Sequence, residues 1–170
     1  MPIAQTYEPL ATTTLSSSAA TINFTSISGS YTDLVIVISG VSSSSNNIFG
    51  RFNSDTGSNY SVTRLSGSGS SALGDRSSNQ TYLTLSNYGW PTTTTGEQNT
   101  FIQIMNYSNT NIFKSVINRS NRANAGVDAI INLWRSTAAI TSISLSTNGF
   151  SGATNWSSGT TATLYGIAAA

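Results

Sequence analysis

The sequence predicts an all-β protein, an antiparallel β-sandwich of jelly-roll-like form with about ten strands. Three observations lead to this prediction. Apolar and polar residues alternate in short runs, turns rich in Ser, Gly and Asn separate these runs, and the strong helix formers Lys and Glu are scarce. No window of the chain sustains the 3.6-residue period of an amphipathic helix.

The predicted strands follow one another at intervals typical of a sandwich or barrel. They are the segments 20–27, 32–39, 47–52, 59–65, 80–86, 100–107, 112–120, 128–136, 140–147 and 161–167. The run LVIVI at 34–38 is apolar at every position, which indicates a strand buried on both faces. The polar stretches between strands are predicted to be loops, at 40–47, 66–79, 88–99 and 148–159.

The chain is predicted to hold one domain. Residues 15–170 form the β-sandwich, and residues 1–14 form an extended N-terminal arm, because this segment contains Pro2 and Pro9 and has weak periodicity. Such an arm would reach a neighbouring subunit or the shell, although a frayed terminus is the alternative.

Composition excludes several classes of partner. Charged residues make up 8% of the 170 residues, and the net charge is +1. The seven basic residues are spread from Arg51 to Arg135 without a cluster, so nucleic-acid binding is not expected. The chain lacks both a basic amphipathic face and an apolar run long enough to cross a bilayer, so no membrane partner is expected.

The inventory of reactive side chains argues against an enzyme. The chain has no histidine and no cysteine, which excludes a Ser-His-Asp triad, disulfides and thiolate metal sites. A hydrolase would depend on carboxylates, but these are scattered over loops, strand starts and a terminal segment, at Glu8, Asp33, Asp55, Asp75, Glu97 and Asp128. The single lysine, Lys114, is predicted to be an edge charge. No catalytic residue, cofactor or metal is expected.

The stretch RFNSDTGSNYS at 51–61 has two interpretations. Its side-chain oxygens and its glycine loosely fit a calcium loop, but one carboxylate is too few for the oxygen ligands that calcium needs. A hairpin with an Asp-Thr-Gly turn needs only a glycine with positive φ. The hairpin is preferred, with Gly57 in the left-handed region, so Gly57→Ala is expected to destabilise the fold.

Three tryptophans are candidate contact residues. Trp134 lies in a strand and is expected in the core. Trp90 and Trp156 lie in predicted loops, where an exposed aromatic side chain stacks on a sugar, contacts a partner subunit or covers the core. Trp90 and Trp156 are therefore the candidate surface contacts.

Several short sequence segments, taken in their order along the chain, resemble small virion proteins of tailed bacteriophages, including cyanophages. These segments are TYEPLATTTL, YTDLVIV, RFNSDTGSNYS, LWRSTAAITSISL and GTTATLYGI, and they span residues 6–167. The resemblance carries over no active-site residue. It implies a β-sandwich on the particle surface, either a head decoration (cement) protein or a tail-fibre domain, and both are expected to be homotrimers.

The leading functional hypothesis is a homotrimeric capsid decoration protein on the head exterior, which stabilises the shell by contacts between capsomers. Its expected partners are its own copies and the major capsid protein, and its expected location is the virion. The alternative is a tail-fibre or receptor-binding domain that grips host glycans through Trp90, Trp156 and polar loops.

Overall fold

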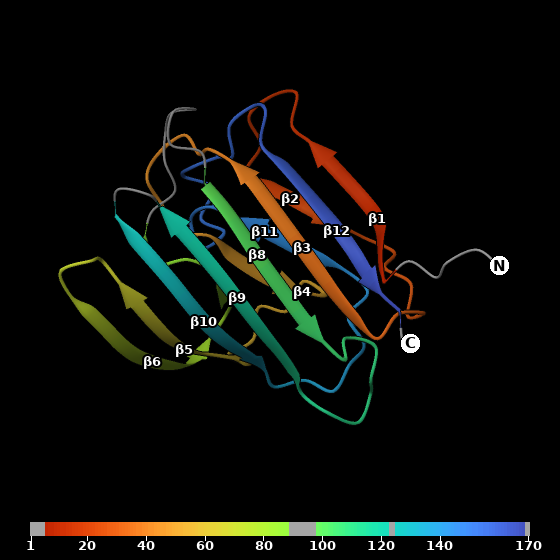
Figure 1. Ribbon diagram of the computed structural model, residues 1–170. Coiled ribbons are helices and arrows are strands. Elements are labelled where there is room, and N and C mark those ends of the chain that lie inside the picture. Colours follow the sequence, from red (N-terminus) through yellow and green to blue (C-terminus); the bar gives the residue numbers. More distant parts are fainter. Residues whose placement is uncertain (1–5, 89–97, 123–124, 169–170) are drawn as a thin grey trace.

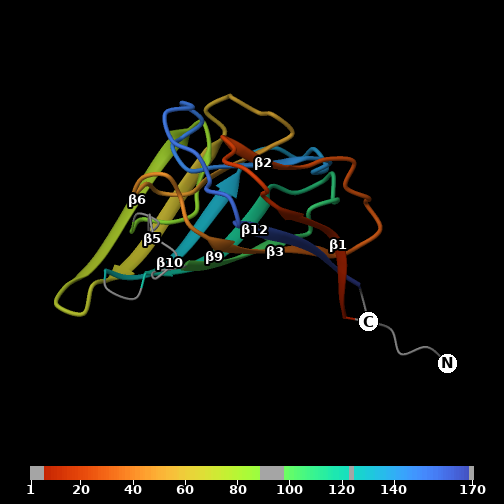
Figure 2. The same cartoon turned by 90° about the horizontal axis from the view of Figure 1, so that it is seen from above.

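The computed structural model describes residues 6–88, 98–122 and 125–168. In these residues, two antiparallel sheets pack face to face, which confirms the predicted jelly-roll-like β-sandwich (Figures 1 and 2). The eight-stranded sheet has the order β1-β12-β3-β8-β9-β10-β5-β6, and the four-stranded sheet the order β2-β11-β4-β7. The strands are β1 (Tyr7–Thr14), β2 (Thr21–Phe24), β3 (Asp33–Gly40), β4 (Phe49–Phe52), β5 (Tyr60–Gly67), β6 (Ala72–Gln80), β7 (Leu83–Thr84), β8 (Gln98–Met105), β9 (Lys114–Arg122), β10 (Gly126–Trp134), β11 (Ile143–Ser146) and β12 (Thr161–Ile167).

The core lies between the two sheets and follows the alternation of the strands. Successive side chains of a strand point to opposite faces, so every second residue of β8, β9 and β10 is buried against the small sheet. Strand β3 differs, because Leu34, Val35 and Ile36 are all buried, as the apolar run predicted. No helix of the described residues is long and apolar enough to cross a membrane.

Two strands form where no strand was predicted. Residues 7–14, expected as an extended arm, form β1 and pair with β12 of the same chain, from Tyr7↔Ile167 to Thr14↔Thr161. Residues 72–80, predicted to be a loop, form β6 and pair with β5. Both segments lack the alternation of a half-buried strand because both are edge strands with little buried surface.

The hairpin prediction for residues 51–61 is wrong. Strand β4 pairs with β11 and β7 in the small sheet, whereas β5 pairs with β10 and β6 in the large sheet. The segment between them is therefore a crossover from one sheet to the other. Its left-handed residues are Asn53 (φ 50°) and Ser54 (φ 57°), not Gly57. The expected strain at Gly57 is absent; a Cβ there would instead lie 2.8 Å from Asn59 Nδ2.

A seam of buried amides joins the two sheets beside β7. The Asn132 side chain accepts a hydrogen bond from the Thr84 amide (3.0 Å) and donates one to the Thr84 carbonyl (2.9 Å). Asn118 donates to the Leu85 carbonyl (2.8 Å) and accepts from Asn132 (3.2 Å). These bonds fix the two-residue strand β7 on the large sheet, because a buried amide side chain needs its partners.

Candidate functional site

The outer face of the eight-stranded sheet carries exposed apolar side chains on three neighbouring strands. Leu65 of β5 is 64% exposed, Val127 and Ile131 of β10 are 59% and 53% exposed, and Ile117 of β9 is 44% exposed. The strand register sets Ile131 opposite Ile117, and Ala129 opposite Leu65. We call these five residues, Leu65, Ile117, Val127, Ala129 and Ile131, the apolar face. Contiguous exposed apolar side chains of this kind mark interaction surfaces.

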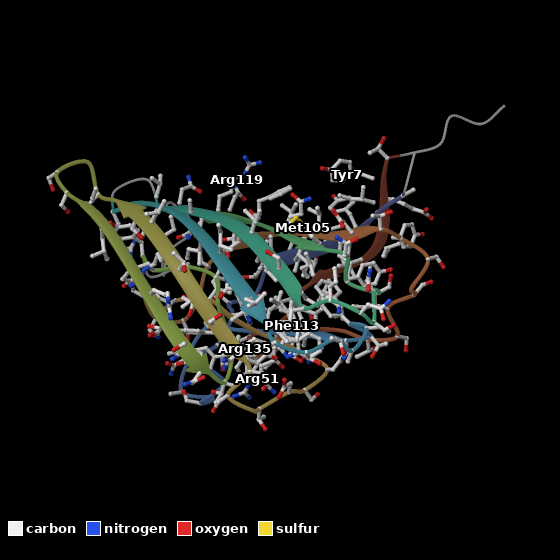
Figure 3. All side chains as sticks on the ribbon, turned by 90° about the horizontal axis from the view of Figure 1, so that it is seen from below. Tyr7, Arg51, Met105, Phe113, Arg119 and Arg135 are labelled. Atoms are coloured by element: carbon white, nitrogen blue, oxygen red, sulfur yellow. The ribbon has the colours of Figure 1, made fainter. Side chains whose placement is uncertain are left out.

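Beside the apolar face, Arg119 of β9 lies over the ring of Phe101 on β8. The two residues are a directly opposed cross-strand pair, and the guanidinium carbon lies 4.7 Å from the ring centroid. Figure 3 shows Arg119 and Tyr7 toward one side of the molecule and Arg51 toward the other. The guanidinium is attracted to the face of the ring, and the Arg119 side chain as a whole stays exposed.

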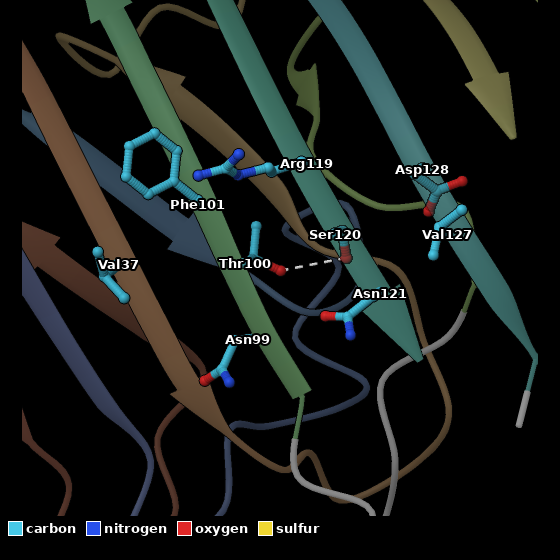
Figure 4. Close-up of a pocket in the computed structure, with 9 residues that line it drawn as sticks. All are labelled: Val37, Asn99, Thr100, Phe101, Arg119, Ser120, Asn121, Val127 and Asp128. Atoms are coloured by element: carbon cyan, nitrogen blue, oxygen red, sulfur yellow. Dashed lines mark hydrogen bonds between the residues drawn. The ribbon is translucent and has the colours of Figure 1, made fainter. Parts of the chain in front are cut away.

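Two shallow grooves flank this stacked pair. One has a volume of ≈ 430 Å³ and is lined by Val37, Asn99, Phe101, Asn121 and Val127, with Arg119 at its side (Figure 4). The other has a volume of ≈ 460 Å³ and is lined by Tyr7, Gln103, Ile117 and Ala129. Apolar walls, amide side chains and one cation suit a partner with an apolar surface and a carboxylate or other acceptor.

Sequence reasoning missed the apolar face, although a signal was present. The segment VDAIINLW of β10 has apolar residues at both odd and even positions, and so on both faces of the strand. Ile130 and Trp134 fill the core, while Val127 and Ile131 face outward. The same holds for β9, where Val116 is buried and Ile117 is exposed. Apolar residues at successive positions in a strand with one solvent-exposed face indicate an interaction surface.

The structure removes Trp156 from the candidate surface contacts. Its side chain is 0% exposed, and its indole Nε1 donates to the Leu145 carbonyl (3.4 Å). Its backbone forms a reciprocal pair of hydrogen bonds with Ala19 (2.8 and 3.1 Å), which brings this loop into the sandwich. Trp90 lies outside the described residues. Trp134 is in the core as predicted, stacked on Tyr60 and edge-on to Phe52.

The carboxylate of Asp55, the residue behind the calcium alternative, is used by the protein itself. Its Oδ1 accepts the Gly57 amide (2.8 Å), and its Oδ2 accepts Asn59 Nδ2 (2.9 Å) and Trp134 Nε1 (2.7 Å). Among the described residues, no group of three or more Asp, Glu, His or Cys side chains could hold a metal ion. Asp55 therefore fastens the crossover loop to the buried indole of Trp134.

These contacts set the acid titration of Asp55. Partial burial raises its pKa, but the hydrogen bonds from Trp134, Asn59 and Gly57 and the charge of Arg51 outweigh that effect. The net result is a pKa below the ordinary value of 3.8. A carboxyl with a lowered pKa in the folded state adds stability above its unfolded pKa and loses it as the pH falls through the folded pKa.

We therefore expect the free-energy difference between wild type and Asp55→Asn to depend on pH. The difference should be full at pH 7 and should shrink as the pH falls below 3.8, because the carboxyl is then protonated in the unfolded state before it is protonated in the folded state. Urea denaturation of both proteins at pH 7 and at pH values from 5 to 2 measures this difference. A difference that stays constant over the whole range would contradict the structural role of the charge.

The other described carboxylates also have partners within the chain, and Glu8 forms a side-chain hydrogen bond with Tyr31. Asp33 accepts the Asn106 amide (2.8 Å), and Asp75 pairs with Arg64. Asp128 is buried and accepts Ser66 Oγ (2.5 Å) and the Asn87 amide (2.8 Å). Glu97 lies outside the described residues.

Lys114 is not the edge charge that the sequence predicted. It begins β9 in the middle of the large sheet and is 0% exposed. Its Nζ donates to three backbone carbonyls, those of Asn109 (2.5 Å), Ile112 (2.8 Å) and Thr137 (3.1 Å). Burial lowers the pKa of the Lys114 ammonium from its ordinary value. The side chain ties two loops together at one end of the sandwich.

Comparison with known proteins gives no family. No family model matches the chain, and no curated protein matches it. Among solved structures, galectin LEC-6 of Caenorhabditis elegans is 9% identical with a TM-score of 0.38, covering 90% of this chain and 94% of the galectin. A protein of unknown function from Shewanella oneidensis is 12% identical with a TM-score of 0.24, covering 96% and 77% of the two chains. The alginate lyase Aly36B is 8% identical with a TM-score of 0.30, covering 94% and 80%.

Proposed function

We propose that this protein is a structural component of a bacteriophage virion, a decoration protein that attaches to the outside of the head through its apolar face. The observation that carries the proposal is the row of exposed side chains on β5, β9 and β10, from 44% to 64% exposed. Such a surface is costly to leave in water and gains free energy when a partner covers it. The resemblance of the sequence to small virion proteins is the reason for proposing a phage particle as the partner.

The proposed protein acts through contacts and needs no reactive group. The surface carries few charges, so the attachment gains little from long-range electrostatics and depends little on salt. Arg119 lies on the outward side of β9, and Arg76 and Arg135 line a depression with Ile131 at another part of this surface, whereas Asp128 and Lys114 are buried. The major capsid protein would therefore present an apolar surface, with an acceptor group for Arg119.

The second candidate is a tail-fibre domain that binds host glycans. The two grooves beside Phe101 and Arg119 favour it, because an aromatic ring, a guanidinium and amide side chains are suitable for stacking and hydrogen bonding with a sugar. The Trp156 that the sequence suggested for this role is buried. In this candidate function, Phe101 and the two grooves beside it would bind the sugar in place of Trp156.

The number of copies per particle separates the two candidates. Quantitative mass spectrometry of purified virions should give a number comparable with that of the major capsid protein. A number far below the capsid protein would place the chain on the tail and overturn the decoration proposal. Absence from the virion would overturn both candidates.

A charge on the apolar face should abolish attachment. We expect Ile131→Lys to weaken binding to particles at least about tenfold, because a lysine there must be desolvated at the centre of the contact. Asn23→Lys is the matched control, since it adds the same charge to an exposed position of β2, in the other sheet. Co-sedimentation with particles that lack the chain measures binding, and unchanged binding of Ile131→Lys would exclude the apolar face as the attachment surface.

A further inference from the structure

One edge of the eight-stranded sheet is long and unprotected. Strand β6 has nine residues, eight of them exposed, and no other described strand pairs with its outer side. The described edges of the small sheet are short, since β2 has four residues and β7 has two. The opposite edge of the large sheet, β1, contains Pro9 and a register shift between Pro9 and Ala11. Proline and irregular pairing are devices that protect an edge; β6 contains no proline, and the irregularity in its pairing with β5 is confined to its end, between Ser77 and Gln80.

The backbone of β6 offers a row of hydrogen-bonding groups to a further strand. The Ser68 amide donates to the Ser71 carbonyl (3.0 Å) and closes the turn between β5 and β6. Because bonded and non-bonded pairs alternate in an antiparallel ladder, Ala72, Gly74 and Arg76 then direct their N–H and C=O groups to the free side. These three residues are all exposed.

The side chains around this edge also favour a partner strand. The ribbon formed by β5 and β6 projects beyond the four-stranded sheet, so another sheet can approach it (Figure 2). Leu65 and Leu73 are 64% and 48% exposed on this ribbon, and Gly67, Ala72 and Gly74 beside them leave the backbone accessible. The carboxylate of the strand, Asp75, is neutralised by Arg64.

We propose that β6 pairs antiparallel with β6 of a second copy of this chain. A strand that meets its own copy across a two-fold axis must run antiparallel to it, which suits the antiparallel ladder already present. Pairing of β6 with β1 of another copy, which would build rings or filaments, is opposed by Pro9. The edge thus points to two copies, whereas the sequence resemblance implies three.

The geometry of this pairing has a consequence for attachment. A two-fold axis that joins two strands of one continuous sheet stands perpendicular to the sheet, so both copies turn the same face to the same side. The apolar faces of the two chains would then point in one direction and could engage a shell together. That consequence depends on the proposed function; the pairing itself does not.

The test uses the purified full chain without particles. Sedimentation equilibrium should give twice the chain mass of 17.8 kDa for wild type. Arg76→Pro removes one outward N–H without removing a bond to β5, and it should give the monomer mass with the circular dichroism of the wild type. Arg76→Ala is the matched control: it keeps the N–H, loses only the charged side chain, and should remain a dimer.

Three results would overturn the pairing: a wild-type monomer at every concentration, a trimer, or a folded Arg76→Pro protein that remains dimeric. If Arg76→Pro does not fold, amide hydrogen exchange on the wild-type protein decides. In the dimer, the amides of Ala72, Gly74 and Arg76 should exchange slowly, and their exchange should speed up on dilution. Fast exchange of these amides at all concentrations excludes β6 as the interface. None of these measurements depends on whether the protein binds a virion.

Discussion

Replacing Trp156 by alanine should lower the free energy of unfolding by about 3–5 kcal/mol. The side chain is 0% exposed and packs in the core, and the truncation leaves a cavity that a closely packed interior cannot fill. The backbone hydrogen bonds between Trp156 and Ala19 hold two segments together that are distant in the sequence. Loss of the Trp156 side chain should therefore destabilise both segments. Urea denaturation monitored by circular dichroism measures the effect.

The matched control for Trp156→Ala is Ile131→Ala on the apolar face. Ile131 is 53% exposed, so its truncation should change the free energy of unfolding by less than about 0.5 kcal/mol. A Trp156→Ala protein as stable as the wild type would mean that this side chain is not part of the core. It would also restore Trp156 as a candidate contact residue.

Replacing Lys114 by methionine should cost about 2–4 kcal/mol of unfolding free energy. Methionine keeps the length of the side chain but has no donor, so the carbonyls of Asn109, Ile112 and Thr137 lose a hydrogen-bond partner in a part-buried place. The cost is reduced by the charge that no longer has to be desolvated, because burial of an ammonium is itself unfavourable.

Arg119→Met provides the control for Lys114→Met, since it removes a cation from the same strand on its exposed side. Its effect on unfolding should stay below about 0.5 kcal/mol. Thermal unfolding at neutral pH compares the two variants. Equal effects of both substitutions would show that the three carbonyl bonds of Lys114 contribute little.

Local patterns predicted the strands that bury at least one face. The runs at 32–39, 100–107 and 161–167 alternate or are wholly apolar, and they became β3, β8 and β12. Strands β1 and β6 could not be found in this way, because an edge strand buries few side chains and obtains its order from a neighbour distant in sequence or across a turn. Pairing of this kind is a property of the whole sheet.

The errors at the candidate site have related causes. Residues 51–61 show two strands separated by Asp-Thr-Gly, and the local sequence does not say that the strands belong to different sheets. Trp156 lies in a Ser- and Gly-rich loop, and its burial follows from the contact with Ala19, which is remote in the chain. The apolar face was missed although its signal is local, since β10 has apolar residues on both of its faces.

The amide seam beside β7 limits how the two sheets can move. Apolar side chains attract without regard to direction, so two sheets held only by such contacts could slide over one another by fractions of a strand spacing at little cost. The bonds from Asn132 to both backbone groups of Thr84 are directional and are lost on a small lateral displacement. The side chains of Asn132 and Asn118 thus oppose sliding of one sheet over the other. These buried hydrogen bonds therefore help to keep the shape of the eight-stranded sheet, and with it the surface that a partner contacts.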